Sequence, residues 1–304
     1  MHGTSTDLAA RVAAGQLAGA GRTRHVVECG PLTGLLHADP LWFLSYAVAT
    51  HPGTPTDPDA VTTALPALRD AFDNAGRALR FELVDEANPG LADVLVGAGL
   101  TVTGRYPLLV CTAAEVTVPA TPPGVVVERV RTAGQAHAVQ ALSAAAFGVD
   151  LGSGSAGPSA GPDPGPAVEP GGGSAGSSVE PDPASAAAGS SASASASAAA
   201  ASVSSVEPDP ADGGSVLATL DGEPVATAAW TAVAGGVTEI VGVATLAAHR
   251  SRGLGGLVTA HAVLAAAEAG GALPWLTPGD DGADRVYRRL GFTPVATAVH
   301  LAIG

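Results

Sequence analysis

The stretch HRSRGLGG, His249 to Gly256, places two arginines and three glycines between two apolar runs. Glu239 to Leu246, before it, has the pattern of a strand, and Leu257 to Ala267, after it, has that of a helix. A glycine-rich turn that opens a helix presents backbone N–H groups without intrahelical partners, and the helix dipole adds partial positive charge there. The stretch therefore predicts a phosphate-binding turn.

The residue types of the turn suit a diphosphate group. Gly253, Gly255 and Gly256 have no Cβ to keep a ligand from the backbone, and Arg250 and Arg252 add charge-assisted donors. A P-loop is excluded because it needs a lysine, and all 14 basic residues are arginine. A dinucleotide fingerprint is excluded because its third glycine, and the acid about 20 residues farther on, are missing. The pattern that remains is R-x-x-G-x-G.

The composition is that of a globular chain that contains a segment of different character. Of the 304 residues, 46% are hydrophobic, which is ample for a packed core. Residues 149–214 are dominated by small residues, prolines and acids, without Lys, Arg or aromatic residues. We expect this segment to be a disordered, low-complexity insertion.

The charge balance bears on the class of ligand. The formal net charge is −14, but the insertion holds 8 of the 28 acids, which leaves 20 acids against 14 arginines elsewhere. This balance argues against a nucleic-acid binder and leaves room for a cationic substrate.

Two cysteines without CxxC spacing suggest neither a disulfide framework nor a metal site. The sequence has no signal-peptide core and no run of about 18 apolar residues, so we expect no membrane association and a cytoplasmic location.

The order of elements predicts two α/β units. Residues 1–118 form the first, 119–124 a Pro-rich linker, and 125–304 the second, which contains the insertion. We expect helices near 8–17, 58–76, 89–99, 133–147, 254–269 and 280–291, with strands near 80–86, 101–112, 125–130, 237–246, 273–279 and 292–303 and a hairpin turn at Asp221 and Gly222.

A weak internal repeat connects the two units. A shift of 192 residues aligns Gly99 with Gly291 and Leu95 with Tyr287. The first unit is therefore interpreted as a degenerate copy of the end of the second.

From Val125 to Gly304, excluding the insertion, the sequence resembles the GNAT superfamily of acetyl-CoA-dependent N-acetyltransferases. The resemblance rests on R-x-x-G-x-G together with TEIVGVATL, LPWLTPG and RVYRRLGF, in that order. The arrangement is similar to actinobacterial-type proteins with a degenerate GNAT-like front half. It implies an α/β fold, a GNAT-like mixed twisted sheet flanked by helices, preceded by a smaller degenerate unit of the same kind.

The resemblance also implies acetyl-CoA as co-substrate. The backbone from Arg250 to Gly256 would cradle the pyrophosphate, and the strand IVGVATL would splay from LPWLTPG so that the pantetheine arm enters between them. The cofactor-binding residues expected on this basis are Val241, Val243, Arg250, Ser251, Arg252, Gly253, Leu254, Gly255 and Gly256.

Glu239 is the candidate general base. An alkyl ammonium with a pKa near 10.4 costs roughly 4.6 kcal/mol to deprotonate at neutral pH, so a base assists. Strand alternation predicts that Glu239 shares a face with Val241 and Val243, and the resemblance implies a base eleven residues before Arg250. The alternatives are a solvated strand acid and a base made of ordered water.

Tyr287 is the candidate acid for the departing thiolate. It matches the family's Y-x-x-x-G-F segment, in which the hydroxyl faces the thioester sulfur. The alternative is an aromatic residue packed in the core.

The resulting hypothesis is an N-acetyltransferase that transfers acetyl to a primary amine of a small molecule or peptide by direct attack. The first alternative is a coenzyme A-binding sensor or scaffold without turnover, and the second is an interaction protein that works through the acidic insertion. In the family, a helix of the acceptor wall usually stands where the insertion falls, and no clear amphipathic helix replaces it here. The acceptor, the acyl range and the oligomeric state stay open.

Overall fold

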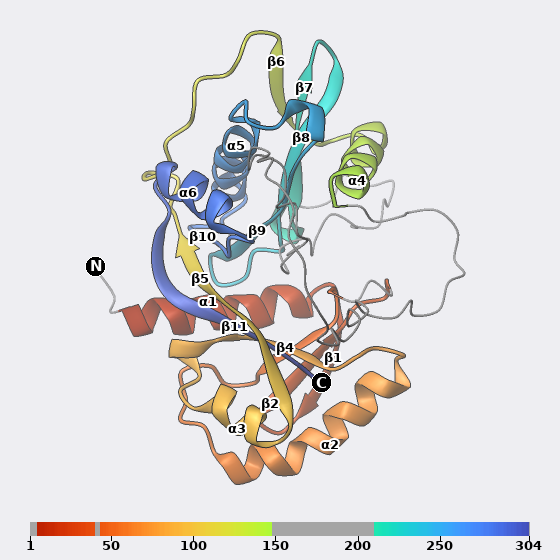
Figure 1. Ribbon diagram of the computed structural model, residues 1–304, viewed down its shortest axis with the longest axis vertical. Coiled ribbons are helices and arrows are strands. Elements are labelled where there is room, and N and C mark those ends of the chain that lie inside the picture. Colours follow the sequence, from red (N-terminus) through yellow and green to blue (C-terminus); the bar gives the residue numbers. More distant parts are fainter. Residues whose placement is uncertain (1–4, 40–42, 148–209, 304) are drawn as a thin grey trace, which may run out of the picture.

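The computed structural model describes residues 5–39, 43–147 and 210–303. These residues form one eleven-stranded sheet in the order β1-β2-β3-β4-β11-β5-β10-β9-β8-β7-β6, flanked by helices (Figure 1). The strands are β1 (His25–Cys29), β2 (Leu32–Leu36), β3 (Tyr46–Ala49), β4 (Arg80–Val84), β5 (Leu100–Val110), β6 (Val125–Arg129), β7 (Gly214–Leu220), β8 (Glu223–Trp230), β9 (Val237–Thr245), β10 (Leu273–Leu276) and β11 (Thr293–Ile303). The helices are α1 (Ser5–Gly21), α2 (Pro58–Asn74), α3 (Leu91–Gly97), α4 (Ala133–Phe147), α5 (Leu254–Glu268) and α6 (Asp281–Arg289), with 3-10 turns η1 (Asp85–Ala87), η2 (Pro210–Asp212) and η3 (Ala247–His249). This is the mixed α/β architecture that the sequence predicts.

The strand order shows the internal repeat as an approximate two-fold arrangement. The strands β5 and β11 are antiparallel neighbours at its centre, β4 flanks β11, and β10 flanks β5. The pair β3 and β4 is parallel, as is the pair β9 and β10. Each central strand follows a short helix that ends at a glycine with positive φ, Gly99 (93°) after α3 and Gly291 (102°) after α6. Glycine is required there because other residues rarely adopt this conformation.

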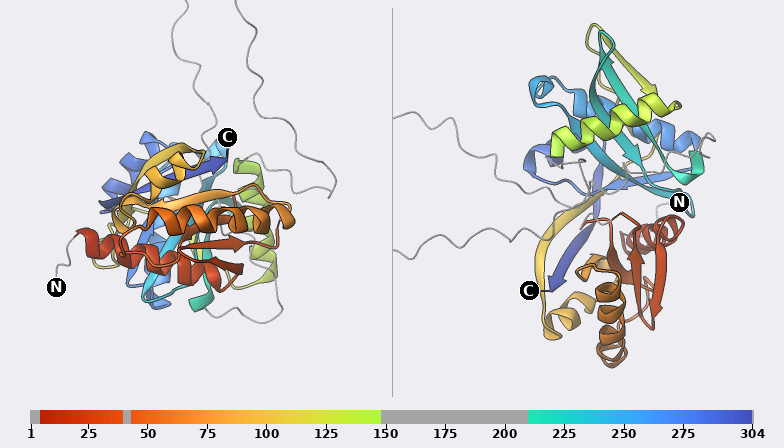
Figure 2. Two further views of the ribbon diagram at one scale, coloured as in Figure 1. Left: turned by 90° about the horizontal axis from the view of Figure 1, so that it is seen from below. Right: turned by 90° about the vertical axis from the view of Figure 1, so that its right-hand side faces the viewer.

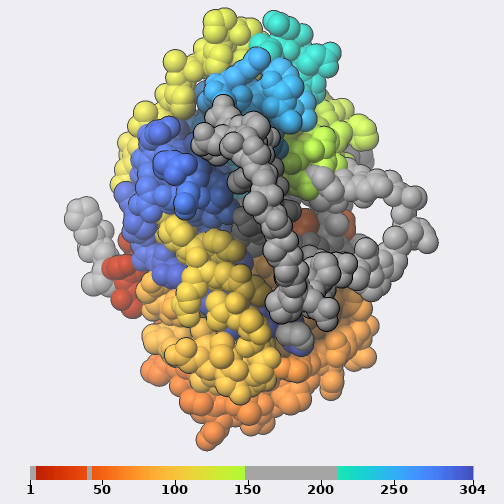
Figure 3. All heavy atoms as spheres, in the orientation of Figure 1, coloured from red at the N-terminus to blue at the C-terminus, as the bar shows by residue number. Residues whose placement is uncertain are grey.

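The central strands are exchanged between the two units. The last strand of the first unit, β5, lies between β10 and β11 of the second, while β11 pairs with β4 from Ala298↔Val84 to Ala302↔Arg80. Both strands cross from one half of the molecule to the other (Figure 2). On the surface, atoms of the C-terminal residues lie against those of the residues near 100 (Figure 3). Hydrogen bonding in the sheet therefore runs across the predicted boundary at residue 118.

The hydrophobic cores are shared in the same way. Leu109 and Cys111 belong to the α5 core, the buried cluster beneath α5. Val299 and Leu301 belong to the α2 core, the cluster beneath α2 and α3. Leu108 belongs to the α1 core, the cluster beneath α1. Since adjacent strand residues point to opposite faces, α1 and α5 cover opposite faces of the sheet at β5.

Two local predictions can be compared directly with the structure. The hairpin turn at Asp221 (φ 51°) and Gly222 (φ 90°) is confirmed, with the two positive φ values of a type I′ turn. The predicted C-terminal limit of the insertion, residue 214, is wrong, because η2 occupies Pro210–Asp212 and Gly214 already pairs with Trp230. Asp212 also forms an ion pair with Arg22, the residue that follows α1. The remaining insertion residues up to 209 lie outside the described residues.

Among the described residues, no helix combines the length and apolar character that a membrane span requires.

We expect the shared cores to make both units unfold together. Leu109→Ala should lower the free energy of unfolding by about 3 kcal/mol because it removes a fully buried side chain from the α5 core. Urea unfolding followed by circular dichroism should keep a single transition, and Leu109→Met should cost less than half as much. Two separate transitions, of which only one shifts, would contradict this prediction.

Candidate active site

The second unit opens where the pairing between β9 and β10 ends. Only Leu273↔Val237, Pro274↔Thr238 and Trp275↔Glu239 are paired in parallel, whereas β9 continues to Thr245. Within the described part of the chain, the β10 side of residues 240–245 has no strand partner. Unpaired backbone at the carboxyl ends of parallel strands is a common place for a ligand.

A β-bulge in β9 changes which side chains face this opening. Gly242 has a φ of 61°, and the register with β8 slips between Ala229↔Val241 and Thr227↔Ala244. Val243 consequently packs against the α5 core, together with Ile240. The prediction that Glu239 shares a face with Val243 is therefore wrong, because the extra residue of a bulge reverses the alternation.

The glycine turn lies at the end of this strand. After η3, Ser251 (φ 62°) and Gly253 (φ 78°) take left-handed backbone conformations, and α5 begins at Leu254. The first helical hydrogen bond beyond the cap runs from Leu257 N to Gly253 O at 3.0 Å. The N–H groups of the first turn therefore precede any intrahelical acceptor. Residues 251–253 are exposed, and the buried Leu254 anchors the turn.

The two arginines of the turn have different surroundings. The Nε group of Arg250 donates to the carbonyl oxygen of Thr245 (3.3 Å), and its Nη2 group to that of Ala146 (3.5 Å). Arg250 therefore ties the turn to β9 and to the last turn of α4. Arg252 is exposed on the same turn.

The glycines differ as well. A Cβ on Gly255 would lie 3.7 Å from Thr245 Oγ1, and one on Gly256 would lie 3.4 Å from Val286 Cγ1 of α6, so both would make ordinary contacts. Gly256 is buried whereas Gly255 is partly exposed, so Gly255 is the position where a longer side chain could be added with less disturbance.

Glu239 lies at the closed end of the opening, opposite Trp275 in the sheet register. It is partly buried, and its backbone N–H donates to Thr231 Oγ1 at 2.9 Å. Burial, together with the nearby charge of Glu82, raises the pKa of Glu239 to about 8, and Arg24 opposes the shift. A carboxyl group with this pKa can exchange a proton near neutral pH.

Tyr287 lies on α6, whose N-cap Asp280 accepts from Ala283 N at 2.7 Å. The centroid of its ring lies 5.9 Å from that of Phe292, and the ring packs against the α5 core. Tyr287 is therefore packed in the core, as the alternative to a catalytic role predicted. Burial, with a smaller contribution from Asp280, raises the pKa of the hydroxyl well above its ordinary value. The hydroxyl is therefore protonated at neutral pH and can donate.

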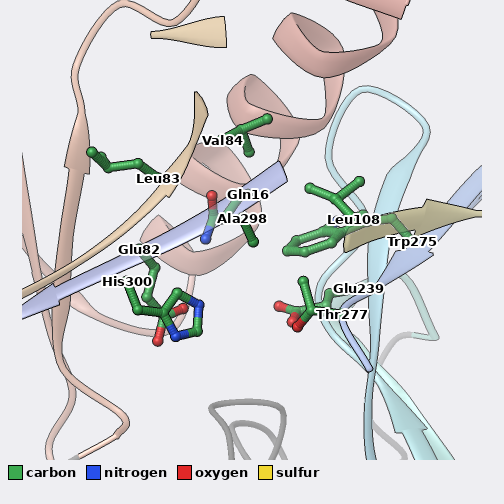
Figure 4. Close-up of a pocket in the computed structure, with 10 residues that line it drawn as sticks. All are labelled: Gln16, Glu82, Leu83, Val84, Leu108, Glu239, Trp275, Thr277, Ala298 and His300. Atoms are coloured by element: carbon green, nitrogen blue, oxygen red, sulfur yellow. The ribbon is translucent and has the colours of Figure 1, made fainter. Parts of the chain in front are cut away.

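Glu239 also lines a pocket that the sequence did not predict. The pocket lies at the seam of the two units (Figure 4). Its lining residues are Gln16, Glu82, Leu83, Val84, Leu108, Glu239, Trp275, Thr277, Ala298 and His300. Glu82 of β4 and His300 of β11 are register partners. Tyr287 is not among the lining residues.

Comparison with known proteins places the chain in a family. The acetyltransferase (GNAT) family model matches residues 192–292. A solved GCN5-related N-acetyltransferase from Kribbella flavida is 45% identical over 97% of this chain and 95% of that one, with a TM-score of 0.74. The chain belongs to the GCN5-related N-acetyltransferase (GNAT) family. Members of this family generally use acetyl-CoA.

Two more distant structures share the fold. A tandem GNAT protein from the clavulanic acid biosynthesis pathway is 13% identical, covering 90% of this chain and 78% of that one, with a TM-score of 0.51. A GCN5-related N-acetyltransferase from Sphaerobacter thermophilus is 14% identical over 89% and 76%, with a TM-score of 0.52. No curated protein matched the chain.

The described residues contain no group of three or more His, Cys, Asp or Glu side chains that could hold a metal ion.

The raised pKa of Glu239 should be measurable as a pH-dependent stability cost. Between about pH 4.5 and 8 the folded protein keeps a proton that the unfolded chain releases, so stability falls as the pH rises through this window. We expect Glu239→Gln to raise the free energy of unfolding by about 2 kcal/mol at pH 8.5 and to change it little at pH 4.5. Urea unfolding at the two pH values measures the difference. An equal effect at both would argue against the shift.

Proposed function

We propose that this GNAT protein is an acetyl-CoA-dependent N-acetyltransferase that transfers acetyl to a primary amine by direct attack. The observation that supports it best is the continuous path from Glu239, along the unpaired edge of β9, to the glycine turn at the start of α5. This path combines a proton acceptor, a backbone edge for amide groups and a helix N-terminus for phosphates.

In this proposal the chain holds the coenzyme mostly through its backbone. N–H groups from Gly253 to Gly256 would bind the pyrophosphate, and the exposed Arg252 would add charge. Arg250 would act indirectly, because its guanidinium braces the turn against Thr245 and Ala146. The edge at Val241 and Val243 would pair with the pantetheine amides.

The chemistry needs a base, an oxyanion donor and an acid. Glu239 would accept a proton from the ammonium group, directly or through water. Main-chain N–H groups near Val243 would polarise the thioester carbonyl, and the Tyr287 hydroxyl would protonate the departing thiolate.

Calorimetric titration with acetyl-CoA tests the coenzyme site. Gly255→Glu places a carboxylate where the diphosphate would bind, so we expect binding to weaken at least 100-fold. Gly255→Ala is the matched control and should bind within a few-fold of the parent, because a Cβ has room there. If a folded parent protein does not bind acetyl-CoA, the proposed function is wrong.

Thiol release with a panel of primary amines tests the catalytic groups. We expect Tyr287→Phe to lower kcat about 10- to 100-fold with little change in acetyl-CoA affinity. The value of kcat/KM should rise with pH through about 8 as Glu239 loses its proton, and Glu239→Gln should abolish this step. Tight coenzyme binding without thiol release for any amine would favour the sensor or scaffold alternative instead.

A further inference from the structure

We propose that the acceptor amine binds, as an ammonium group, in the pocket between the two units, and that Glu82 of the degenerate first unit is the second carboxylate that holds it. This inference rests on the proposed acetyl transfer and adds an acceptor-binding residue contributed by the first unit.

The exchanged strands bring Glu82 and Glu239 to one pocket on one face of the sheet. Val237, Val84 and Ala296 belong to the α1 core on β9, β4 and β11. Glu239 lies two residues after Val237 on β9, and Glu82 lies two residues before Val84 on β4. Ala298 and His300 follow Ala296 on β11 at the same spacing, and all four residues line the pocket. The pocket thus continues the face that α1 covers, and Gln16 of α1 forms part of its wall (Figure 4).

One carboxylate oxygen of Glu82, Oε1, lacks a hydrogen-bond donor within the described part of the chain. The residue is 9% exposed, and Arg80 Nη2 lies 3.0 Å from its Oε1 atom. This ion pair does not have hydrogen-bond geometry, and Oε1 accepts no hydrogen bond from the described residues. A buried acceptor in this state is costly unless a ligand or water donates to it.

The charges of the pocket allow one cation to replace the proton of Glu239. Glu82 is offset by Arg80, while Arg24 lies close enough to act on Glu239. Burial lowers the pKa of His300, which favours its neutral form, and the rings of His300 and Tyr106 are 5.0 Å apart. With Glu239 protonated, the two guanidinium groups and the Glu82 carboxylate leave one net positive charge, and the set becomes neutral once Glu239 loses its proton. An ammonium group that enters as this proton leaves would therefore take over its charge, and the net charge of these groups would not change.

Apart from Glu82, Glu239 and His300, the described residues that line the pocket have side chains without an ionisable group. Tyr46 of β3 is buried near both carboxylates and its pKa is raised, so its hydroxyl stays protonated. Trp275, Leu108 and Ala298 make one side apolar (Figure 4). The cavity is only about 10 Å³, which is room for about one water molecule, so the amine head alone would enter. The acceptor class is therefore a primary ammonium at the end of an apolar stem.

These groups account for every proton and bond in the acetyl transfer. One ammonium proton passes to Glu239, the nitrogen–carbon bond forms and the carbon–sulfur bond breaks. The departing sulfur takes the hydroxyl proton of Tyr287. The nitrogen then loses its second proton, which passes through water to the Tyr287 oxygen. Glu82 takes no part in these proton transfers and positions the nitrogen.

Steady-state kinetics of Glu82→Gln test the assignment. We expect the KM for butylamine or phenethylamine to rise at least 10-fold, with the KM for acetyl-CoA unchanged. The apparent pKa near 8 in kcat/KM should fall, because the like charge of Glu82 raises the pKa of Glu239 in the parent. The control Glu28→Gln, at an exposed position of β1, should change neither. An unchanged amine KM and pH profile in Glu82→Gln would overturn the inference.

A binding measurement on the parent separates this inference from acetyl transfer itself and needs no variant. The same amines are titrated calorimetrically into the coenzyme A-loaded protein at pH 7, in two buffers of different ionisation enthalpy. We expect binding with release of up to one proton, because the cation lowers the pKa of Glu239. Binding with proton release, but without acetylation, supports the pocket and rejects the enzyme. Absence of binding, or binding without proton release, rejects the pocket.

Discussion

The antiparallel pairing of β5 with β11, from Thr293↔Val110 to Ile303↔Leu100, fixes the position of everything on either side of it. Because β10 attaches to one of these strands and β4 to the other, the two units share a single sheet. Their cores interlock in the same way, with Leu109 in one and Leu301 in the other. The first unit is therefore part of the second unit's fold, whatever catalytic features it lacks.

The candidate site depends on where this sheet stops pairing. The strands β9 and β10 are hydrogen bonded as far as Glu239 and Trp275, so the backbone edge beyond is available beside the glycine turn. On the other side of Glu239, the exchanged strands bring Glu82 and His300. A carboxyl group between an apolar sheet face and another acid holds its proton more tightly than one in water, and this gives Glu239 its raised pKa.

The features that the sequence predicts well are local ones. The turn between β9 and α5, the elements around it and the repeat at Gly99 and Gly291 follow from neighbouring residues or from a fixed shift along the chain. The bulge at Gly242 was missed because a lone glycine in a strand does not reveal its φ, and it reversed the side chain of Val243. The role of Arg250 as a brace depends on the carbonyl of Ala146, which no motif indicates. The pocket was missed because Glu82 meets Glu239 only through strand exchange, a non-local event.

The position of β11 far after β4 and β5 in the chain has a consequence for synthesis on the ribosome. Neither unit can complete its sheet until Thr293–Ile303 has been made, because β4 and β5 both wait for this strand. The nascent chain thus carries two incomplete sheet edges until β11 has been made, and such edges favour aggregation until they are covered. Folding of both units is expected to wait for one late step, the addition of this eleven-residue strand.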